Sequence, residues 1–440
     1  MKLAVFGATR IGVTAAATFA ANGYDVICAD DDKTIISALK NGSVPFNESG
    51  LQERYNEALR TGMLAFSTNK LAAAAEASYL LFTESLQTNE DQVPDLTNLY
   101  RFIRQIAVSV QSHKTFIIKS TVPPGTTTRI HNILIEQGLT EQDFEVIHNP
   151  DFSRPGTIVK DFTHPSELII GTSSLRGCRL MESFYSPLTN ALQFMDYASA
   201  ELMKYACHTY LALNSSCLNM IAGMAERYGA DVEVIHGALR ADPRMGHHSR
   251  HPGSFYQGNE SISNVSTFRE MENQSFSGSK LINLIEEIER YQPEILTQKL
   301  KDFLGTLHGS IIGVLGDSYT KEAPSPSDLV SKRLEEEGAE VRFFDPSMEH
   351  HHSSQYRSLM NDTVSNCDAL LLLTELPLIQ NVDWGQVVKR QRLPLLVDGH
   401  NLFTLEEARK IANEHDLIYC SIGRPNIYKG LGAISVQQSI

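Results

Sequence analysis

The chain has 440 residues, 42% of them hydrophobic and 20% charged, a length that predicts two or three domains rather than a single hydrophobic core. Its 38 basic and 52 acidic residues give a formal net charge of −14, which argues against nucleic acid or an anionic membrane as partner. The first 25 residues lack a signal-peptide pattern, and no apolar run approaches the roughly 20 residues of a membrane span. Six scattered cysteines without a CxxC pair favour a reducing, cytoplasmic location.

The N-terminal part alternates between apolar runs and helical patterns. Residues 1–6 form a short apolar run that enters a glycine turn, and the Ala-rich run 11–21 predicts a helix. A second apolar run, 24–29, ends at Asp30, and further runs follow at 79–83, 115–119 and 144–148. This alternation is typical of an α/β fold with a parallel sheet covered by helices on both faces.

The middle of the chain changes character. Residues 199–228 carry apolar side chains at helical spacing without proline, which predicts a long helix that could join two halves and present a dimer face. Residues 241–276 are rich in Ser, Asn, His and Gly and predict a long irregular loop, a kind of segment that is often functional.

A second α/β half follows the loop. The apolar run 311–316 opens it, and the next strands are predicted at 341–344, 369–374 and 395–397. We therefore predict an α/β fold of two Rossmann-like domains joined by a long central helix. The predicted domains are a dinucleotide-binding domain (1–195), a central helical region with a substrate loop (196–300) and a C-terminal nucleotide-binding domain (301–440).

The sequence GATRIG, residues 7–12, lies between a predicted strand and helix, with Asp30 23 residues after Gly7. In a GxGxxG fingerprint the glycines allow a tight turn, a close approach to the pyrophosphate and helix–strand packing, and the acidic residue binds a ribose hydroxyl. Thr9 occupies the second position, where it would crowd the pyrophosphate, although its hydroxyl could donate a hydrogen bond. We predict NAD rather than NADP, or else an inherited scaffold without cofactor. The predicted binding residues are Gly7, Thr9, Arg10, Ile11, Gly12 and Asp30.

Several sequence blocks occur in the order found in one known family. They are STVPPGTT (120–127), HNPDFSRPGTIVKDFTHP (148–165), ELMKYACHTY (201–210), FFDP (343–346) and SIGRP (421–425). Together they resemble the UDP-glucose/GDP-mannose 6-dehydrogenase family over nearly the whole chain. The segment HPGSFYQGNESISN (251–264) resembles that family's active-site motif PGxGYGGSCFPKD.

The resemblance implies a function and partners. The family uses NAD twice to oxidise the C6 alcohol of a nucleotide sugar, and a cysteine thiolate captures the intermediate aldehyde. It further implies a UDP-sugar-binding C-terminal domain, a homodimer formed through the central helix, and a place in polysaccharide biosynthesis.

The family's six catalytic positions can be located one by one. Thr121, near the nicotinamide, and Lys204 match the family. The other four differ, because a Glu has become Asp151, an Asn has become His208, the nucleophilic Cys has become Glu260 and an Asp has become Asn264. A carboxylate at position 260 cannot form a thiohemiacetal, and an amide at position 264 cannot act as a base.

Other family features are weakened as well. Ser85-Leu86 replaces a TP dipeptide near the cofactor, and His400 replaces an Arg in a DGRN-type turn. The segment SYTKEAPSP (318–326) lacks an arginine that reaches the substrate in the family. Groups that anchor the substrate are therefore reduced along with the catalytic ones.

Two groups of histidines are candidates for a metal site. They are His247, His248 and His251 in the substrate loop and the run 350–352. Neither has neighbouring cysteines or carboxylates at ligand spacing, so we predict no metal.

Three functional interpretations remain open. The favoured one is a catalytically degenerate homologue that binds a nucleotide or nucleotide sugar without the two-step oxidation. The second is an NAD-dependent oxidoreductase with altered chemistry or substrate. The third is a conventional dehydrogenase with its nucleophile elsewhere, although no cysteine lies between Cys217 and Cys367.

Overall fold

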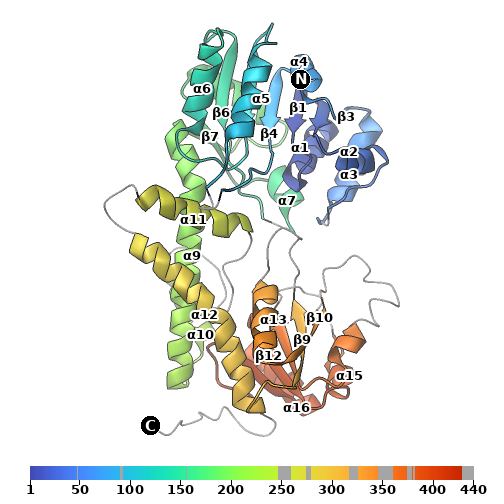
Figure 1. Ribbon diagram of the computed structural model, residues 1–440, viewed down its shortest axis with the longest axis vertical. Coiled ribbons are helices and arrows are strands. Elements are labelled where there is room, and N and C mark those ends of the chain that lie inside the picture. Colours follow the sequence, from blue (N-terminus) through green and yellow to red (C-terminus); the bar gives the residue numbers. More distant parts are fainter. Residues whose placement is uncertain are drawn as a thin grey trace. The chain divides into compact units, whose positions relative to one another are not determined.

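The computed structural model describes most of the chain (Figure 1). The described residues are 1–46, 48–89, 93–154, 156–245, 259–273, 279–316, 326–344, 360–373, 379 and 382–428, with the backbone alone at 259–261, 272–273, 279 and 326. They form two compact units, Met1–Cys207 with Ser266–Glu270, and His208–Val265 with Met271–Ile440. The three predicted domains divide the chain more finely and stay a prediction.

The first unit is built on an eight-stranded sheet in the order β3-β2-β1-β4-β5-β6-β7-β8. Neighbouring strands are parallel except for β6 and β7. The strands are β1 (Lys2–Phe6), β2 (Asp25–Ala29), β3 (Leu64–Ser67), β4 (Tyr79–Phe82), β5 (Lys114–Ile118), β6 (Phe144–His148), β7 (Leu168–Gly171) and β8 (Leu192–Met195). The helices are α1 (Arg10–Ala21), α2 (Lys33–Lys40), α3 (Leu51–Thr61), α4 (Lys70–Glu76), α5 (Thr97–Ala107), α6 (Thr126–Glu136), α7 (Ile158–Thr163) and α8 (Leu175–Tyr185).

Alternate side chains of this sheet enter two separate cores. Leu3 and Val5 of β1 pack in a core with residues of α1, α3 and α8, whereas Ala4 and Phe6 pack in a core with residues of α4, α5 and α6. Successive side chains of a strand point to opposite faces. Helices therefore cover both faces of the sheet, which confirms the predicted doubly wound arrangement.

The second unit holds a five-stranded parallel sheet in the order β10-β9-β11-β12-β13. Its strands are β9 (Ile311–Gly316), β10 (Glu340–Phe344), β11 (Ala369–Leu373), β12 (Leu395–Asp398) and β13 (Ile418–Ser421). The remaining helices of the chain are α9 (Tyr197–Tyr228), α10 (Val232–Ala241), α11 (Asn259–Asn273), α12 (Ser279–Leu304), α13 (Pro326–Glu336), α15 (Trp384–Val388) and α16 (Leu405–His415). Side chains of α9, α10, α12 and α13 share one core of this unit, and side chains of α15 and α16 share the other.

The predicted fold class is confirmed, because α9 spans the predicted central helix and each predicted strand of the second half is present. One expectation is wrong, since the predicted irregular segment 241–276 contains the helix α11. Its Ser and Asn residues are poor helix formers, but Asn264, Val265 and Thr267 are buried. Burial of this kind overrides weak local propensity.

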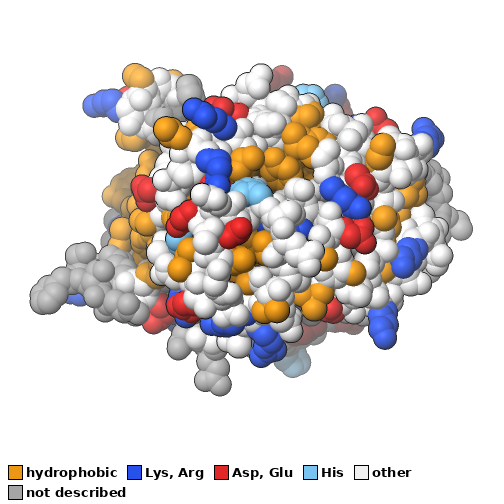
Figure 2. Space-filling model, turned by 90° about the horizontal axis from the view of Figure 1, so that it is seen from above, with side chains coloured by type: hydrophobic (Ala, Val, Ile, Leu, Met, Phe, Trp, Pro, Cys, Tyr) orange, Lys and Arg blue, Asp and Glu red, His pale blue; other side chains and the backbone are white. Residues whose placement is uncertain are grey.

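The surface drawn in Figure 2 carries mixed charge. Lys and Arg side chains lie among Asp and Glu side chains, and hydrophobic side chains form separate patches between them. Interspersed charges of opposite sign keep the local field weak on this face. No helix in the described ranges is both long and apolar enough to cross a membrane.

Ionisable groups are buried where β5 and β6 end. His148 is 1% exposed, and Lys119 and Asn149 are buried beside it. The Tyr185 hydroxyl donates to Asn149 Oδ1 at 2.6 Å, which ties α8 to this end of the sheet. Burial, and then the charge of Lys119, lowers the pKa of His148 from 6.5 to about 3, so the folded protein keeps this imidazole neutral.

We predict that His148 makes the protein less stable in mild acid. The unfolded chain takes up a proton near pH 6.5 that the folded chain rejects until about pH 3. The contribution of neutral, buried His148 to the free energy of unfolding is therefore complete above pH 6.5 and is lost as the pH falls toward 3. Between pH 7 and pH 5 the loss from this group is about 2 kcal/mol.

The check is urea denaturation at both pH values for the wild type, His148→Phe and a control, His164→Phe, at an exposed position. His148→Phe should abolish this part of the pH dependence, and the control should keep it. The readout is the difference between the two pH values, so a general loss of stability does not affect it. Equal pH dependence in all three proteins would contradict the assignment.

Candidate functional site

The loop between β1 and α1 depends on two glycines. Gly7 has φ of +98°, a backbone conformation that favours glycine. A Cβ atom at Gly7 would also lie 2.8 Å from the Glu84 amide nitrogen, and one at Gly12 would lie 1.9 Å from the Gly7 carbonyl oxygen. Gly7 therefore allows the turn, and Gly12 allows the close approach of α1 to the loop.

Thr9 is the N-cap of α1. Its Oγ1 accepts a hydrogen bond from the Gly12 amide at 3.0 Å and donates to the Thr83 carbonyl at 3.1 Å. The single hydroxyl proton is thus used inside the protein rather than directed to a pyrophosphate. Thr9 satisfies one of the amides that a helix leaves without an intrahelical partner.

The start of α1 offers further donors. Within the part of the chain that the structure describes, the amides of Thr9, Arg10 and Ile11 have no hydrogen-bond partner. Unpaired amides at the N-terminus of a helix, together with the helix dipole, form a binding site for anions. These three predicted residues therefore provide suitable donors for a phosphate group.

Asp30 lies beside the same loop. Its Oδ2 accepts from the Ala8 amide at 2.6 Å, and its Oδ1 accepts from the Asp32 amide at 2.8 Å. Two backbone amides thus fix the carboxylate at the carboxyl end of β2. A carboxylate at this place binds a ribose hydroxyl in Rossmann folds.

A cavity of about 1040 Å³ opens at the loop, at the upper end of the range of about 300–1,000 Å³ that small-molecule and cofactor pockets have. Gly7, Thr9 and Asp30 of the predicted site lie in its wall. The other lining residues are Asp31, Thr68, Asn69, Lys70, Leu71, Glu84, Ser85, Leu86, Gln87, Asp95, Asn98, Leu99, Arg101, Phe102 and Gln105.

The Arg10 side chain extends toward Glu48, and the two charged groups are 3.9 Å apart. Glu48 also accepts hydrogen bonds from the amides of Gly156 and Ile158 at 3.0 and 2.9 Å. The guanidinium of Arg10 thus helps to hold the segment that leads into α7. Only its backbone amide is placed among the donors of the dinucleotide loop.

Two buried lysines meet at Asp151. Lys119 Nζ lies 3.2 Å from Asp151 Oδ1, and Lys204 Nζ donates to the Asp151 carbonyl oxygen. Asp151 Oδ2 accepts from the Ser153 hydroxyl at 2.5 Å. Burial acts to raise the pKa of Asp151, but the charges of the two lysines and the Ser153 hydrogen bond outweigh it and hold the pKa below its usual value. The cluster therefore contains a stable carboxylate between two cations.

The structure brings Asp151 and Lys204 into contact and adds Lys119, which was not among the predicted site residues. The one available signal was a lysine at the end of the apolar run 115–119, next to the block STVPPGTT. Thr121 lies in the loop after β5 and is half-buried. Its predicted role near the nicotinamide stays a prediction.

Two substituted positions of the second unit contact each other. Asn264 Nδ2 lies 2.9 Å from His208 Nδ1. An amide nitrogen only donates, so the ring nitrogen is the acceptor in this contact. Glu260 belongs to α11, but its side chain lies outside the described residues.

Several positions singled out in the sequence lie outside the part of the chain that the structure describes. His247, His248 and His251, the run 350–352 and most of 318–326 lie outside the described residues. Among the residues that are described, no group of three or more His, Cys, Asp or Glu side chains is arranged to hold a metal ion.

The DGHN turn after β12 is a structural junction. Asn401, with φ of +52°, accepts from the Ile422 amide at 3.0 Å and donates to the Ile422 carbonyl at 2.9 Å. Asp398 accepts from the His400 amide at 3.1 Å and from the Tyr419 hydroxyl at 2.7 Å. These bonds join the turn to β13 and to the residues that follow it.

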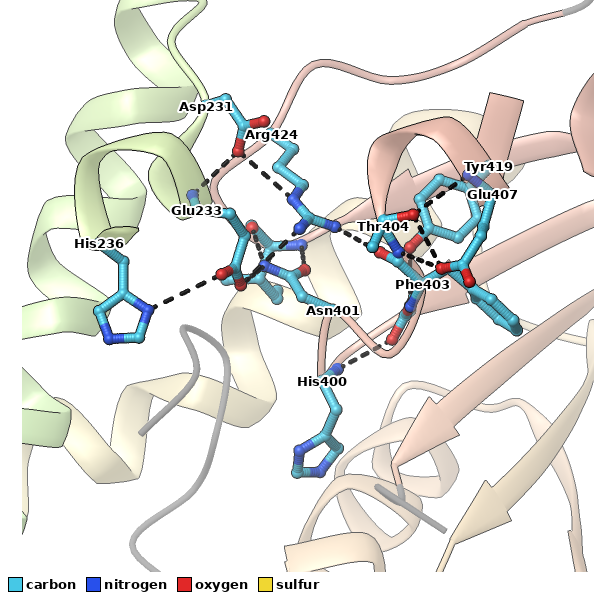
Figure 3. Close-up of polar contacts among 12 residues, drawn as sticks. Asp231, Glu233, His236, His400, Asn401, Phe403, Thr404, Glu407, Tyr419 and Arg424 are labelled. Carbon is cyan, nitrogen blue, oxygen red and sulfur yellow. Dashed lines mark hydrogen bonds and ion pairs between the residues drawn. The ribbon is translucent and has the colours of Figure 1, made fainter. Parts of the chain in front are cut away.

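Arg424 of the SIGRP block completes this junction (Figure 3). Its guanidinium lies 3.4 Å from Asp231 and 3.8 Å from Glu233, and donates to the Phe403 carbonyl at 2.8 Å. His236 of α10 lies 3.7 Å from Glu233. The buried arginine therefore links α10 to the ends of β12 and β13.

The residues of the first unit fit a nicotinamide dinucleotide. Unpaired amides at the start of α1 suit the pyrophosphate, the fixed Asp30 carboxylate suits a ribose, and the adjoining cavity is large enough. When bound in such a site, the nicotinamide accepts a hydride from an alcohol.

Comparison with known proteins gives the same result for all three parts of the chain. Residues 1–189 match the NAD binding domain of the UDP-glucose/GDP-mannose dehydrogenase family, residues 198–291 its central domain and residues 320–405 its UDP binding domain. A putative UDP-glucose 6-dehydrogenase of Bacillus subtilis is 30% identical over 97% of this chain and 100% of its own length.

Solved structures agree. A UDP-glucose dehydrogenase from Pyrobaculum islandicum has a TM-score of 0.82 and 26% identity, covering 95% of this chain and 96% of its own. A UDP-D-ManNAc dehydrogenase from Pyrococcus horikoshii has a TM-score of 0.82 and 26% identity, covering 96% of this chain and 99% of its own. The chain therefore belongs to the UDP-glucose/GDP-mannose dehydrogenase family, whose members are NAD-dependent.

Proposed function

We propose that this chain is a divergent member of its family that binds NAD and a nucleotide sugar, with a UDP-sugar favoured, but does not carry out the two-step oxidation. The binding half of this proposal is supported by the loop and cavity of the first unit and by the match of residues 320–405 to a UDP binding domain. The catalytic half is supported by the substitutions at positions 151, 208, 260 and 264.

The observation that carries the proposal is the contact between Asn264 and His208. By resemblance these positions hold an Asp and an Asn, so a family member has a carboxylate where this chain has an amide. The amide has no basic atom with which to take up a proton. Asn264 is therefore suited to holding its neighbour by a hydrogen bond and unsuited to acting as the base that the resemblance implies at this position.

The nucleophile is the second argument. Glu260 occupies the position of the family's cysteine, and the nearest cysteines along the chain are Cys217 and Cys367. Burial raises the pKa of the Cys367 thiol to about 11, which keeps it protonated and weakly nucleophilic at neutral pH.

An NAD-dependent oxidoreductase with altered chemistry is the second candidate. It is favoured by Lys204, whose ammonium is buried and hydrogen-bonded at Asp151 as part of a structured cluster. A one-step oxidation would need the cofactor site and a proton acceptor but no thiolate. A conventional dehydrogenase is the third and requires a nucleophile from elsewhere in the chain.

We predict that ligands stabilise the protein without turnover. A ligand that binds only the folded state, at 100 times its dissociation constant, stabilises it by about 2.7 kcal/mol. For units of this size that corresponds to a rise in melting temperature of several degrees. The measurement is thermal denaturation with NAD, NADH, UDP-glucose, UDP-glucuronate and GDP-mannose, with NADH absorbance followed in the same samples. NADH formation would exclude the degenerate enzyme, and the absence of any shift would exclude binding.

We predict that Glu260→Cys alone does not restore oxidation. A positioned general base raises the rate of a reaction by about 10²–10⁴-fold. The Glu260→Cys variant still has Asn264, whose amide cannot act as that base. The rate of NADH formation with UDP-glucose should equal that of the matched control Glu260→Ser. Adding Asp151→Glu, His208→Asn and Asn264→Asp to Glu260→Cys should raise the rate above both. A faster rate in the single Glu260→Cys variant than in Glu260→Ser would contradict the proposal.

We also propose that the chain forms a homodimer through α9. In the second unit this helix exposes a stripe of side chains spaced seven, three, four and four residues apart, which places them on one face. They are Tyr210, Cys217, Met220, Met224 and Tyr228, and the four apart from Cys217 are 49–73% exposed. A contiguous apolar stripe on an exposed helix is typical of an interface.

The predicted effect of charge on this stripe is dissociation. Met220→Glu with Met224→Glu would place four carboxylates in a symmetric interface, where desolvation and repulsion oppose association. Sedimentation velocity should give twice the chain mass of 48.9 kDa for the wild type and the chain mass for the variant. Val234→Glu, an exposed position on α10, is the control and should remain dimeric. A monomeric wild type, or a dimeric double variant, would refute the interface.

A cytoplasmic location and a place in polysaccharide biosynthesis remain part of the proposal. The location rests on the six scattered cysteines, all of which have free thiols in the structure. The pathway rests on the family resemblance alone.

A further inference from the structure

The wall of the cofactor cavity contains an ion-pair bridge that the family motifs do not account for. Lys70 Nζ lies 2.7 Å from Glu84 Oε1 and 2.7 Å from Asp31 Oδ2. Asp31 follows β2, Glu84 follows β4, and Lys70 begins α4, so one ammonium group joins three elements. All three residues line the cavity together with Gly7 and Thr9.

Glu84 lies against the dinucleotide loop. A Cβ atom built on Gly7 would lie 2.8 Å from the Glu84 amide nitrogen and 3.0 Å from its Cγ. The Ser120 hydroxyl donates to the Glu84 carbonyl at 2.7 Å, which fixes this backbone. The carboxylate is therefore held next to the loop whose amides would receive a pyrophosphate. An uncompensated carboxylate at this place would repel that anion.

The position of Lys70 is not explained by its helix. Lys70 is the first residue of α4, where the positive end of the helix dipole disfavours a cation. Its side chain is only 16% exposed, and the ammonium lies 4.8 Å from the centre of the Phe102 ring. Burial acts to lower the pKa of Lys70, but its hydrogen bonds to Asp31 and Glu84 outweigh this and raise the pKa. The lysine therefore remains charged because the two carboxylates outweigh the effect of burial.

We propose that Lys70 is the charge-compensating residue of the cofactor site, which neutralises Glu84 beside Gly7 and so allows the cavity to accept the pyrophosphate of a dinucleotide. The inference rests on the proposed binding of NAD. It adds a determinant of affinity, formed by Lys70 and Glu84, that lies outside the glycine fingerprint and Asp30. Lys70 and Glu84 act as a unit, so the loss of affinity caused by removing the lysine should be reversed by also removing the carboxylate of Glu84.

The test is binding by the full-length protein, measured by fluorescence titration with NADH and by calorimetry with ADP-ribose and adenosine. Lys70→Met should weaken NADH and ADP-ribose binding about tenfold or more at low salt, the effect of one charge several ångströms away. The weakening should shrink in 0.5 M salt, where such interactions are screened. Adenosine, which has no phosphate, should bind equally to wild type and variant.

Two further variants separate charge from structure. Lys70→Arg should retain binding, and Lys70→Met with Glu84→Gln should restore it to within about threefold, because the carboxylate next to the dinucleotide loop is then removed together with its counter-charge. The matched control is Lys2→Met, since Lys2 also bridges two carboxylates, Glu76 at 2.8 Å and Asp25 at 3.7 Å, but does not line the cavity. A purely structural bridge would lower the melting temperature without the salt dependence or the rescue.

The outcomes are distinct. If the wild type binds NADH and Lys70→Met binds equally well, the inference is wrong and the proposed function stands. The inference is also wrong if Glu84→Gln gives no rescue. If the wild type binds neither NADH nor ADP-ribose, the cofactor part of the proposed function fails, and the inference fails with it.

Discussion

The contact of two buried lysines with one buried aspartate is the constraint on which the first unit depends. Asp151 lies between Lys119 at the end of β5 and Lys204 of α9, so a single short side chain and its own carbonyl connect the sheet to the long helix. Removal of one member of a buried ion pair is strongly destabilising because it leaves an uncompensated charge. Any change of residue 151 therefore affects both folding and the candidate site. The Ser153 hydroxyl further fixes the carboxylate.

By resemblance, the two parts of the candidate site keep the family's residues to different degrees. On the cofactor side, Gly7 and Gly12 meet the steric demands of a dinucleotide loop, and Thr9 caps α1. On the other side, Asn264 and His208 contact each other. The amide of Asn264 makes a hydrogen bond but cannot act as a base.

The C-terminal unit shows why family motifs persist without guaranteeing a reaction. The DGHN and SIGRP blocks form a junction in which Asn401 binds both backbone groups of Ile422, and Arg424 bonds to the Phe403 carbonyl. Buried polar groups need such partners, because an unsatisfied one costs about 1–3 kcal/mol. Selection for folding alone could retain these residues, so function has to be argued from the geometry of each site.

The sequence by itself determined the fold class, the strands β1, β2, β4 to β6 and β9 to β12, and the extent of α9, because periodicity and glycine turns act over neighbouring residues. It also located the dinucleotide loop, where Gly7 and Gly12 are close in the chain. Tertiary structure alone decided the rest. The helix α11 forms from weak helix formers because its middle is buried.

The ion pairs of the site were also beyond the sequence. Lys70 meets Glu84, and Lys119 meets Asp151, only because the parallel register of the strands brings their carboxyl ends to one edge. Thr9 illustrates the same limit within a single loop. Its sequence position suggested contact with a ligand, and the three-dimensional course of the chain directed its hydroxyl to Thr83 instead. Local pattern specifies which elements form, whereas contacts between side chains distant in sequence depend on how those elements pack.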